Sequence, residues 1–353
     1  MGIAADGLVL IVAFLVILVG AELFTNGIEW FGRKLELAEG AVGSVLAAVG
    51  TALPETMIPI IAILFTGGEA ENVGIGAILG APFMLATLAM FVTGVAVMAM
   101  GRHRPTGDRV LADTHVLTHD VRYFAIAYAI AIATAFLPET FSWVRFIVAA
   151  GLLGIYAWYV KLHFEADANV SAEDLAPLRM HRIDRQAHRA DPAVPRLRIV
   201  SLQVLVALTC IIVGAYAFVG SIDALASSLG ADPALLALVI APIATELPEK
   251  FNSVIWVRQG KDTLALGNIT GAMVFQSTIP TVIALVFAGS AWHVTEDSLI
   301  AFASAGIAFL SMAVIFVPVA RSGVLTGRRL LTGGVFYLLY LGLVLGRLAG
   351  API

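Results

Sequence analysis

The sequence predicts an all-α membrane protein with ten transmembrane helices, arranged as two inverted repeats of five. Three observations predict this fold class: the composition, the spacing of uncharged stretches, and an internal similarity between the two halves. Of the 353 residues, 59% are hydrophobic and 13% are charged, and the mean hydropathy is +0.93. A soluble domain averages roughly 45–50% apolar and about 25% charged residues. The composition therefore excludes a soluble globular protein, a disordered chain and a nucleic-acid binder.

Ten stretches without Asp, Glu, Lys or Arg mark the expected helices. A spanning helix needs about 20 mostly apolar residues, so the shorter stretches must extend past a charged residue. A polar segment divides the stretches into two groups of five. The stretches are 7–21, 40–54, 72–101, 123–138 and 146–160, then 199–222, 233–245, 263–295, 298–320 and 330–346.

The polar segment defines the expected organisation of the chain. Residues 1–162 form a first five-helix repeat, residues 163–198 a polar linker, and residues 199–353 a second, inverted repeat. The linker is rich in Asp, Glu, His and Arg, contains three prolines and has no long apolar face. We expect it to be a solvated cytoplasmic connector.

The positions of the charges predict the topology. Asp6 precedes the first apolar run and no Lys or Arg does, so we expect a permanent helix rather than a cleavable signal. With the N-terminus outside, the odd-numbered connections contain 18 of the 21 Lys and Arg residues, as the positive-inside rule requires. Both termini are then external and the linker is cytoplasmic. We expect the plasma (inner) membrane of a prokaryote.

The two halves are similar in sequence. Segments 20–55 and 214–249 have the same length and share Gly, Phe, Thr and Leu-Pro-Glu at matched positions. A second shared motif follows, GAILGA at 76–81 and GNITGA at 267–272. Five helices per copy mean that the second copy enters the membrane from the opposite side. Inverted repeats of this kind are typical of secondary transporters whose site lies at the membrane midplane.

Two carboxylates within apolar stretches are the candidate ion ligands. Glu55 and Glu249 occupy matched positions, and a charged side chain at the membrane centre costs at least about 2.5–3.5 kcal/mol. The prolines that precede them, at positions 54 and 248, cannot donate a backbone hydrogen bond and leave a carbonyl free. Thr51 and Thr245 add hydroxyls on the same helix faces. Carboxylate, hydroxyl and carbonyl oxygens suit a hard cation such as Ca²⁺, Na⁺ or Mg²⁺.

At these residues the chain resembles the cation/calcium exchanger superfamily, typified by sodium/calcium exchangers. The family's GTSLPE segment corresponds to GTALPE at 50–55 and ATELPE at 244–249, and its GNxxGSN-like segment to the second motif. The resemblance implies two inverted five-helix halves, Glu55 and Glu249 as paired cation ligands, and oxygens from Thr51 and Thr245. It also implies that helices two, three, seven and eight form the centre and that helices one and six move across it.

The chain departs from the family pattern at several positions. Pro82 and Met273 replace an amide or carboxylate residue, and Ala77 replaces an asparagine that the second half keeps as Asn268. Glu246 and Lys250 are charged additions around Glu249. They can form an i, i+4 ion pair, or Glu246 can face the pore and repel Glu249, which favours a proton carrier. A lysine beside the site could also replace one bound Na⁺.

The remaining polar residues of the second half have two interpretations. They line the ion path, or they make hydrogen bonds between packed helices. They are Asn252, Ser253, Asn268, Gln276 and Ser277. Glu22 lies deeper in the first helix by residue count and is a further, weaker candidate for the ion path.

The predicted function is secondary active cation antiport, with Ca²⁺ exchanged for Na⁺ or H⁺ by alternating access. A proton-coupled exchanger of another divalent cation is the alternative. A cation channel and an intramembrane enzyme are more distant, since the chain has no HExxH or GxSxG motif. The expected partners are inorganic cations and the bilayer, with no nucleic acid and no resident cofactor. Cys210 is the single cysteine, which excludes an internal disulfide and a cysteine metal cluster. The oligomeric state is left open.

Overall fold

The computed structural model describes residues 3–34, 53–66, 68, 70–104, 106–166, 177–181, 195–258, 260–296 and 298–348, and in α9 it describes only the backbone of residues 242–252. The first half contains α1 Ile3–Lys34, α3 Leu53–Ile60, α4 Ala70–Met84, α5 Met90–Met100, α6 Thr114–Ala133 and α7 Val144–Ala166. The second half contains α8 Leu197–Leu229, α9 Pro233–Arg258, α10 Asp262–Phe287, α11 Leu299–Ser322, α12 Gly327–Leu330 and α13 Thr332–Leu348. Two π-helical segments, η2 Ile61–Thr66 and η3 Leu85–Ala89, continue α3 and α4. Two short strands, β1 Arg109–Val110 and β2 Leu325–Thr326, pair in antiparallel fashion.

The helices confirm an all-α membrane protein. Among the described residues, eight helices are long and apolar enough to cross a membrane, and Glu55–Thr66 is a shorter apolar helix. Large apolar side chains cover the outside of the bundle, for example Leu15, Phe146, Leu205 and Leu338. Such a surface requires a lipid environment, because it would be costly in water. The count of ten spans and their inversion remain predictions.

One helix begins earlier than the uncharged stretch predicted. α6 starts at Thr114 and not near residue 123, so the charged segment before residue 123 is helical. The reason is a side-chain cap: Asp113 Oδ1 accepts hydrogen bonds from the backbone N–H groups of His115 and Val116. This cap satisfies donors that a helix start otherwise leaves without partners.

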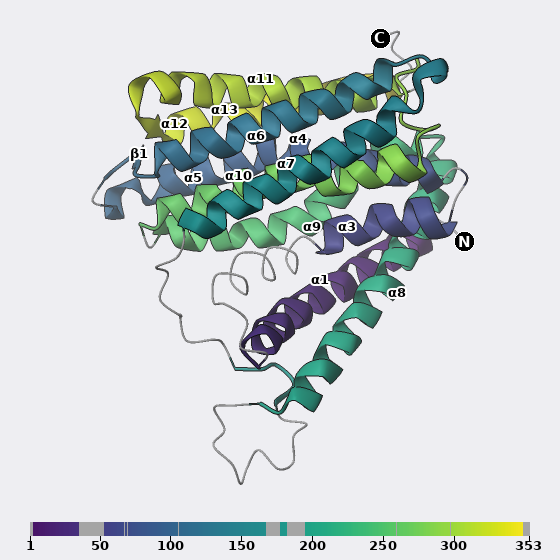
Figure 1. The fold of residues 1–353 in the computed structure, drawn as a ribbon, viewed down its shortest axis with the longest axis horizontal. Coiled ribbons are helices and arrows are strands. Elements are labelled where there is room, and N and C mark those ends of the chain that lie inside the picture. Colours follow the sequence, from purple (N-terminus) through teal and green to yellow (C-terminus); the bar gives the residue numbers. More distant parts are fainter. Residues whose placement is uncertain are drawn as a thin grey trace.

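Four helices form the centre of the bundle. Each of α3, α4, α9 and α10 contacts the other three, as we expected for the second, third, seventh and eighth helices. α6 and α7 pack on α10, while α11, α12 and α13 pack on the continuous helix of α4, η3 and α5. α1 and α8 pack against each other over much of their length and extend together away from the other helices (Figure 1).

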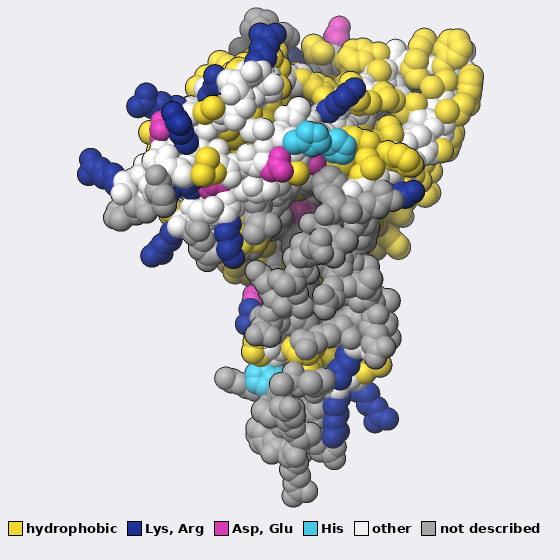
Figure 2. Space-filling view, turned by 60° about the vertical axis from the view of Figure 1, so that its left-hand side comes forward, with side chains coloured by type: hydrophobic (Ala, Val, Ile, Leu, Met, Phe, Trp, Pro, Cys, Tyr) yellow, Lys and Arg dark blue, Asp and Glu magenta, His cyan; other side chains and the backbone are white. Residues whose placement is uncertain are grey.

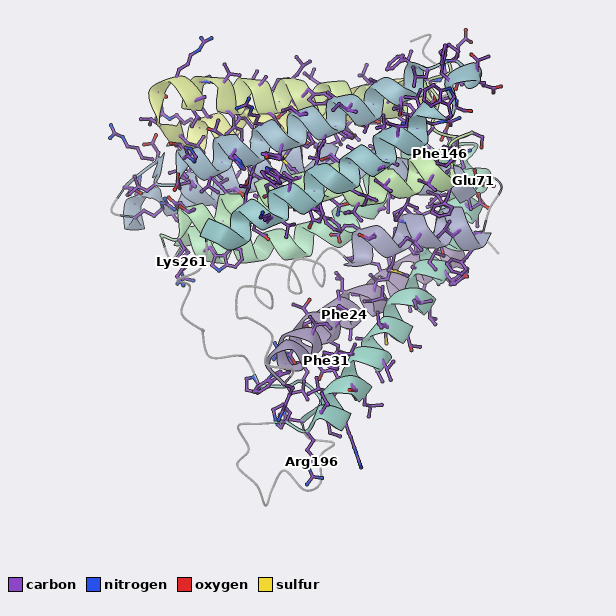
Figure 3. All side chains as sticks on the ribbon, viewed as in Figure 1. Phe24, Phe31, Glu71, Phe146, Arg196 and Lys261 are labelled. Carbon is purple, nitrogen blue, oxygen red and sulfur yellow. The ribbon has the colours of Figure 1, made fainter. Side chains whose placement is uncertain are left out.

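The connections alternate between two ends of the bundle. At one end, Arg104 from the α5–α6 connection makes a bidentate, buried ion pair with Asp262 at the start of α10, and β1 pairs with β2. At the other end, the backbone N–H of Val294 donates to the carbonyl of Ala135 at 3.0 Å. Figure 3 shows Lys261 at the first end and Glu71 and Phe146 at the opposite end.

Basic side chains are concentrated at the first end. The exposed residues there are Arg102, Arg109, Arg258, Lys261, Arg321 and Arg328. Figure 2, which brings this end forward, shows Lys and Arg side chains gathered there and hydrophobic side chains over the surface farther away. The opposite end has exposed Glu139 and Glu296. This asymmetry is the pattern that the positive-inside rule associates with a cytoplasmic end.

Part of the linker packs on the helices, contrary to the expectation of a solvated connector. Leu178 is only 1% exposed and packs with Trp30 of α1 and Val200 of α8. The N–H of Arg179 donates to Asn26 on α1 at 3.0 Å, and the N–H of Met180 donates to Gln203 on α8 at 2.8 Å. The Asn26 and Gln203 side chains are also bonded to each other. Backbone groups of residues 177–181 thus find partners on both helices.

Matched glycines of the two halves make the same kind of contact between α1 and α8. A Cβ at Gly20 would lie 2.9 Å from Ile211 Cγ1 and 3.1 Å from the carbonyl oxygen of Ala207. A Cβ at Gly214 would lie 2.7 Å from Ile17 Cγ1 and 3.1 Å from the carbonyl oxygen of Ala13. The residues in the two contacts correspond: adding 194 to residue numbers 13, 17 and 20 of α1 gives residues 207, 211 and 214 of α8. The order of these contacts shows that the two helices are antiparallel, and equivalent residues of the two helices make equivalent contacts.

We expect Gly20→Ala and Gly214→Ala to lower the melting temperature in detergent by similar amounts. Each added methyl group must displace the facing helix, and overpacking of this kind costs typically about 1–3 kcal/mol. The matched control is Gly220→Ala on the exposed face of α8, where a Cβ meets nothing within 4 Å among the described residues. Since alanine favours helix by up to about 1 kcal/mol over glycine, that variant should be neutral or stabilised. Equal melting temperatures for all three variants would contradict the close contact.

Candidate functional site

The two copies of the second motif lie in the most buried helices of the bundle. Among the eight described candidate spans, burial is greatest in α10, where 67% of the most apolar 18-residue stretch is buried. The corresponding share is 61% in the span that contains α4 and α5. Residues 76–81 lie on α4 and residues 267–272 lie on α10. Because α4 and α10 also contact α3 and α9, the four motif-bearing segments belong to helices that all meet at the centre.

A glycine of the motif brings two of these helices into backbone contact. A Cβ at Gly76 would lie 2.1 Å from the carbonyl oxygen of Ala234, in the first turn of α9. No side chain fits at that distance, so only glycine allows this approach. The contact fixes α4 against the start of the helix that contains Glu249.

Glu55 lies in this central region. It occupies the first turn of α3 and is 7% exposed. The apolar residues Ile58 and Ile61, one and two turns further along, are each 1% exposed. A carboxylate with so little exposure to water must be stabilised by hydrogen-bond donors or by a cation. Thr51, the predicted hydroxyl ligand on this helix, lies outside the described residues.

α9 is the corresponding helix of the second half. Its backbone is helical from Pro233 to Arg258 and continues through Pro248, which has no N–H to donate to the carbonyl of Ala244. That carbonyl is therefore available to another partner. The side chains of Thr245, Glu246, Glu249, Lys250 and Asn252 are outside the description, and their roles remain predictions. The structure places their backbone on a helix in contact with α3, α4 and α10.

Of the other predicted path residues, two serines make helix contacts. Ser253 on α9 is fully buried and its hydroxyl donates to the carbonyl of Ala265 on α10 at 3.1 Å. Ser277 is also fully buried and donates to Val274 within α10 at 3.0 Å. Asn268 is half-buried and Gln276 is 3% exposed, both on α10.

The two positions that lack the family's oxygen ligands are buried. Met273 is 0% exposed within the main apolar core, and Pro82 is a buried residue inside α4. Neither side chain can coordinate a hard cation. Glu22, the other acidic candidate, lies on the surface of α1, where it pairs with Arg179 of the linker at 3.0 Å. Its side chain is 65% exposed, which favours solvation over a place on the ion path.

Sequence reasoning missed the buried carboxylate of Asp120. Asp120 on α6 is 1% exposed and accepts hydrogen bonds from Tyr159 on α7 and Thr270 on α10. Asp120 lies in the segment that was expected to be a connection, so its burial was not anticipated. The capping residue Asp113, just before the helix, is the signal that could have extended the predicted helix to include it.

No resident metal centre is found in the part of the chain that the structure describes. Within those residues, no three His, Cys, Asp or Glu side chains gather closely enough to hold a metal ion. A transported cation needs fewer permanent ligands than a structural one, because it must also leave the site.

The repeated motifs thus lie on helices that meet at the centre of an apolar bundle, which is the architecture of a membrane transporter. The family model for the sodium/calcium exchanger protein matches the chain over residues 7–164 and 199–349. The chain belongs to the sodium/calcium exchanger family, and this confirms the resemblance inferred from the motifs.

Individual relatives are distant in sequence. The chain is 23% identical over 255 residues, 72% of each chain, to "Uncharacterized membrane protein MJ0091" of Methanocaldococcus jannaschii. The H⁺/Ca²⁺ exchanger CAX has a similar structure, with a TM-score of 0.66 and 16% identity over 96% of this chain and 82% of that one. The sodium-calcium exchanger NCX_Mj gives a TM-score of 0.56 and 15% identity over 97% and 99%. These structures share the fold.

We expect Glu55→Gln and Glu249→Gln each to abolish cation flux in proteoliposomes while the protein still elutes as a folded species in detergent. An amide keeps the shape of the side chain but removes the charge that attracts the cation. Glu71→Gln, the same change in the first turn of α4 at the end of the bundle, is the control and should retain flux. Flux at the wild-type rate in either of the first two variants would disprove the assignment of that residue.

Proposed function

We propose that the protein is a secondary active antiporter that exchanges Ca²⁺ for Na⁺ or H⁺ across a membrane. Glu55 and Glu249 bind the cation, and Thr51, Thr245 and freed backbone carbonyls supply further oxygens. The observation that carries the proposal is the burial of Glu55 on a helix that contacts all three other motif-bearing helices. Family membership supports cation exchange as the activity.

An inverted duplication underlies the mechanism that we propose. Two observations support it: Gly20 and Gly214 make equivalent contacts with the facing helix, and one family model matches both halves of the chain. We infer repeats at residues 1–162 and 199–353, joined by the linker at 163–198. Two halves of opposite orientation give a site at the midplane that either half can expose.

Alternating access would come from the α1–α8 pair. These helices are packed on each other through glycines and tied together at one end by residues 177–181. Both also contact α3 and α9, which carry the two glutamates. A tilt of the pair as one body would therefore open the central site first to one side and then to the other.

The ligands missing at Pro82 and Met273 favour coupling to protons as the second candidate. With both side chains apolar, the site has fewer oxygens than several Na⁺ ions require. Protons need only the two glutamates. The cation exchanged could then be a divalent cation other than Ca²⁺, and Lys250 would occupy the place of one monovalent ion.

Radiotracer uptake into proteoliposomes tests the function. We expect ⁴⁵Ca²⁺ accumulation only when an outward gradient of Na⁺ or of H⁺ is imposed, because antiport couples the two fluxes. Lys250→Ala in the same vesicles should change the ion dependence or the coupling ratio if its ammonium substitutes for a cation. Uptake that is independent of both gradients would indicate a channel and contradict antiport, and an unchanged ratio in Lys250→Ala would reduce that lysine to a partner of Glu246.

We also propose that the end of the bundle that contains Lys261 is cytoplasmic and that both termini are external. Single cysteines in a Cys210→Ser background test this orientation in intact cells. We expect a membrane-impermeant maleimide to label Glu139→Cys and Ala4→Cys, and to label Lys261→Cys only after permeabilisation. All three positions are exposed on the described surface. The reverse labelling pattern would overturn the orientation.

A further inference from the structure

A buried hydrogen-bond network connects one copy of the second motif to two neighbouring helices. Asp120 on α6 is 1% exposed. Its Oδ1 accepts a hydrogen bond from the Tyr159 hydroxyl at 3.0 Å, and its Oδ2 accepts one from the Thr270 hydroxyl at 2.6 Å. The carboxylate thus joins α6, α7 and α10 through both of its oxygens.

Thr270 lies inside the second motif, at the third position after Gly267. A helical residue two positions away points to a very different face, so Thr270 faces α6 while Asn268 lies on another side of α10. The matched residue of the first motif is Leu79, which is 0% exposed within the apolar core. One copy of the motif is therefore held by apolar packing and the other by a carboxylate.

Aromatic rings hold Tyr159 in place. Its ring centroid lies 5.5 Å from that of Tyr123, 6.3 Å from that of Tyr156 and 6.4 Å from that of His119. These rings come from α6 and α7, the two helices that flank α10. The phenol hydroxyl therefore meets Asp120 from a side chain that has little freedom to move.

Hydrogen bonds depend on direction, so this network constrains the orientation of its helices more than apolar packing does. A hydroxyl that donates to a carboxylate makes a short, strong bond whose geometry is narrow. A buried carboxylate is also expensive, and in a membrane helix it usually has a functional reason. The bond to Thr270 fixes both the rotation of α10 about its axis and its depth relative to α6.

We propose that Asp120 is a positioning residue for the cation site, acting through Thr270 on the motif of α10. The inference rests on the proposed function of that site. Hard cations bind oxygens at about 2.3–2.6 Å. A small rotation of α10 would therefore move Asn268, the predicted path residue of this motif, relative to the cation held by Glu55 and Glu249. Asp120 itself does not touch the cation. Its loss weakens cation binding without removing a ligand.

The test is the split between apparent KM and maximal rate for ⁴⁵Ca²⁺ uptake in proteoliposomes. Loss of folded protein lowers only the maximal rate, whereas displaced ligands raise KM. We expect Asp120→Asn and Thr270→Val each to raise KM about tenfold, which corresponds to about 1.4 kcal/mol. Thr270→Ser keeps the hydroxyl and should restore the wild-type KM. The double variant Asp120→Asn/Thr270→Val should raise KM by less than the product of the two single effects, because both substitutions act on the bond between Asp120 and Thr270.

Thr278→Val is the matched control. Thr278 is also a fully buried threonine of α10, but its hydroxyl donates to Val274 and Phe275 of its own helix. It should leave KM unchanged. Tyr159→Phe is a milder probe of the network if Asp120→Asn fails to fold, and it should raise KM in the same direction.

The outcomes separate this inference from the proposed function. If wild-type vesicles show no gradient-driven cation uptake, the proposed function is wrong and the positioning role falls with it. If wild-type uptake is present and Thr270→Val and Tyr159→Phe change KM no more than Thr278→Val, only the positioning role is overturned. A double variant whose KM is the product of the two single effects would also overturn it.

Discussion

The close approach of helix backbones at glycine is the constraint on which this architecture depends. Lipid provides no hydrophobic drive for helices to associate, so contact must come from tight packing. At Gly76 the α4 backbone lies against the carbonyl of Ala234, at a distance that excludes any side chain. The contact is part of the extensive packing between α4 and α9, which lie with α3 and α10 at the centre of the bundle. A larger residue there would separate the helices that carry the polar groups.

The buried carboxylates of the bundle differ in their hydrogen-bond partners. At the end rich in arginine, Asp262 receives both guanidinium nitrogens of Arg104 and the backbone N–H of Leu111, and the charges cancel. On α6, Asp120 accepts hydrogen bonds from the hydroxyls of Tyr159 and Thr270, which come from two other helices. Glu55 is the carboxylate that we assign to the ion.

Much of the helical framework could be predicted from uncharged stretches, because a helix in lipid must be apolar over its whole length. The same criterion failed where buried helical segments contain charged residues. It read the segment around Asp120 as a connection, although the Asp113 cap starts the helix earlier. It also read Leu178 as part of a solvated linker, because a single apolar residue gives no periodic signal. Proline, glycine and glutamate repeated at matched positions indicated the site helices, but pairwise partners such as Thr270 depend on helix rotation, which one sequence does not encode in an obvious pattern.

The equivalence of the α1 and α8 contacts at Gly20 and Gly214 has an energetic consequence. When a contact is its own image under exchange of the halves, a tilt in one direction and the equal tilt in the other have the same energy as far as that contact is concerned. Any preference for one resting state must then come from groups that have no counterpart in the other half. Residues 177–181 bind the pair at one end only, and Asp120 holds α10 where Leu79 holds α4. In the alternating-access mechanism that we propose, substitutions at these unmatched positions would change the balance between the two states, whereas equal substitutions at Gly20 and Gly214 would leave that balance unchanged.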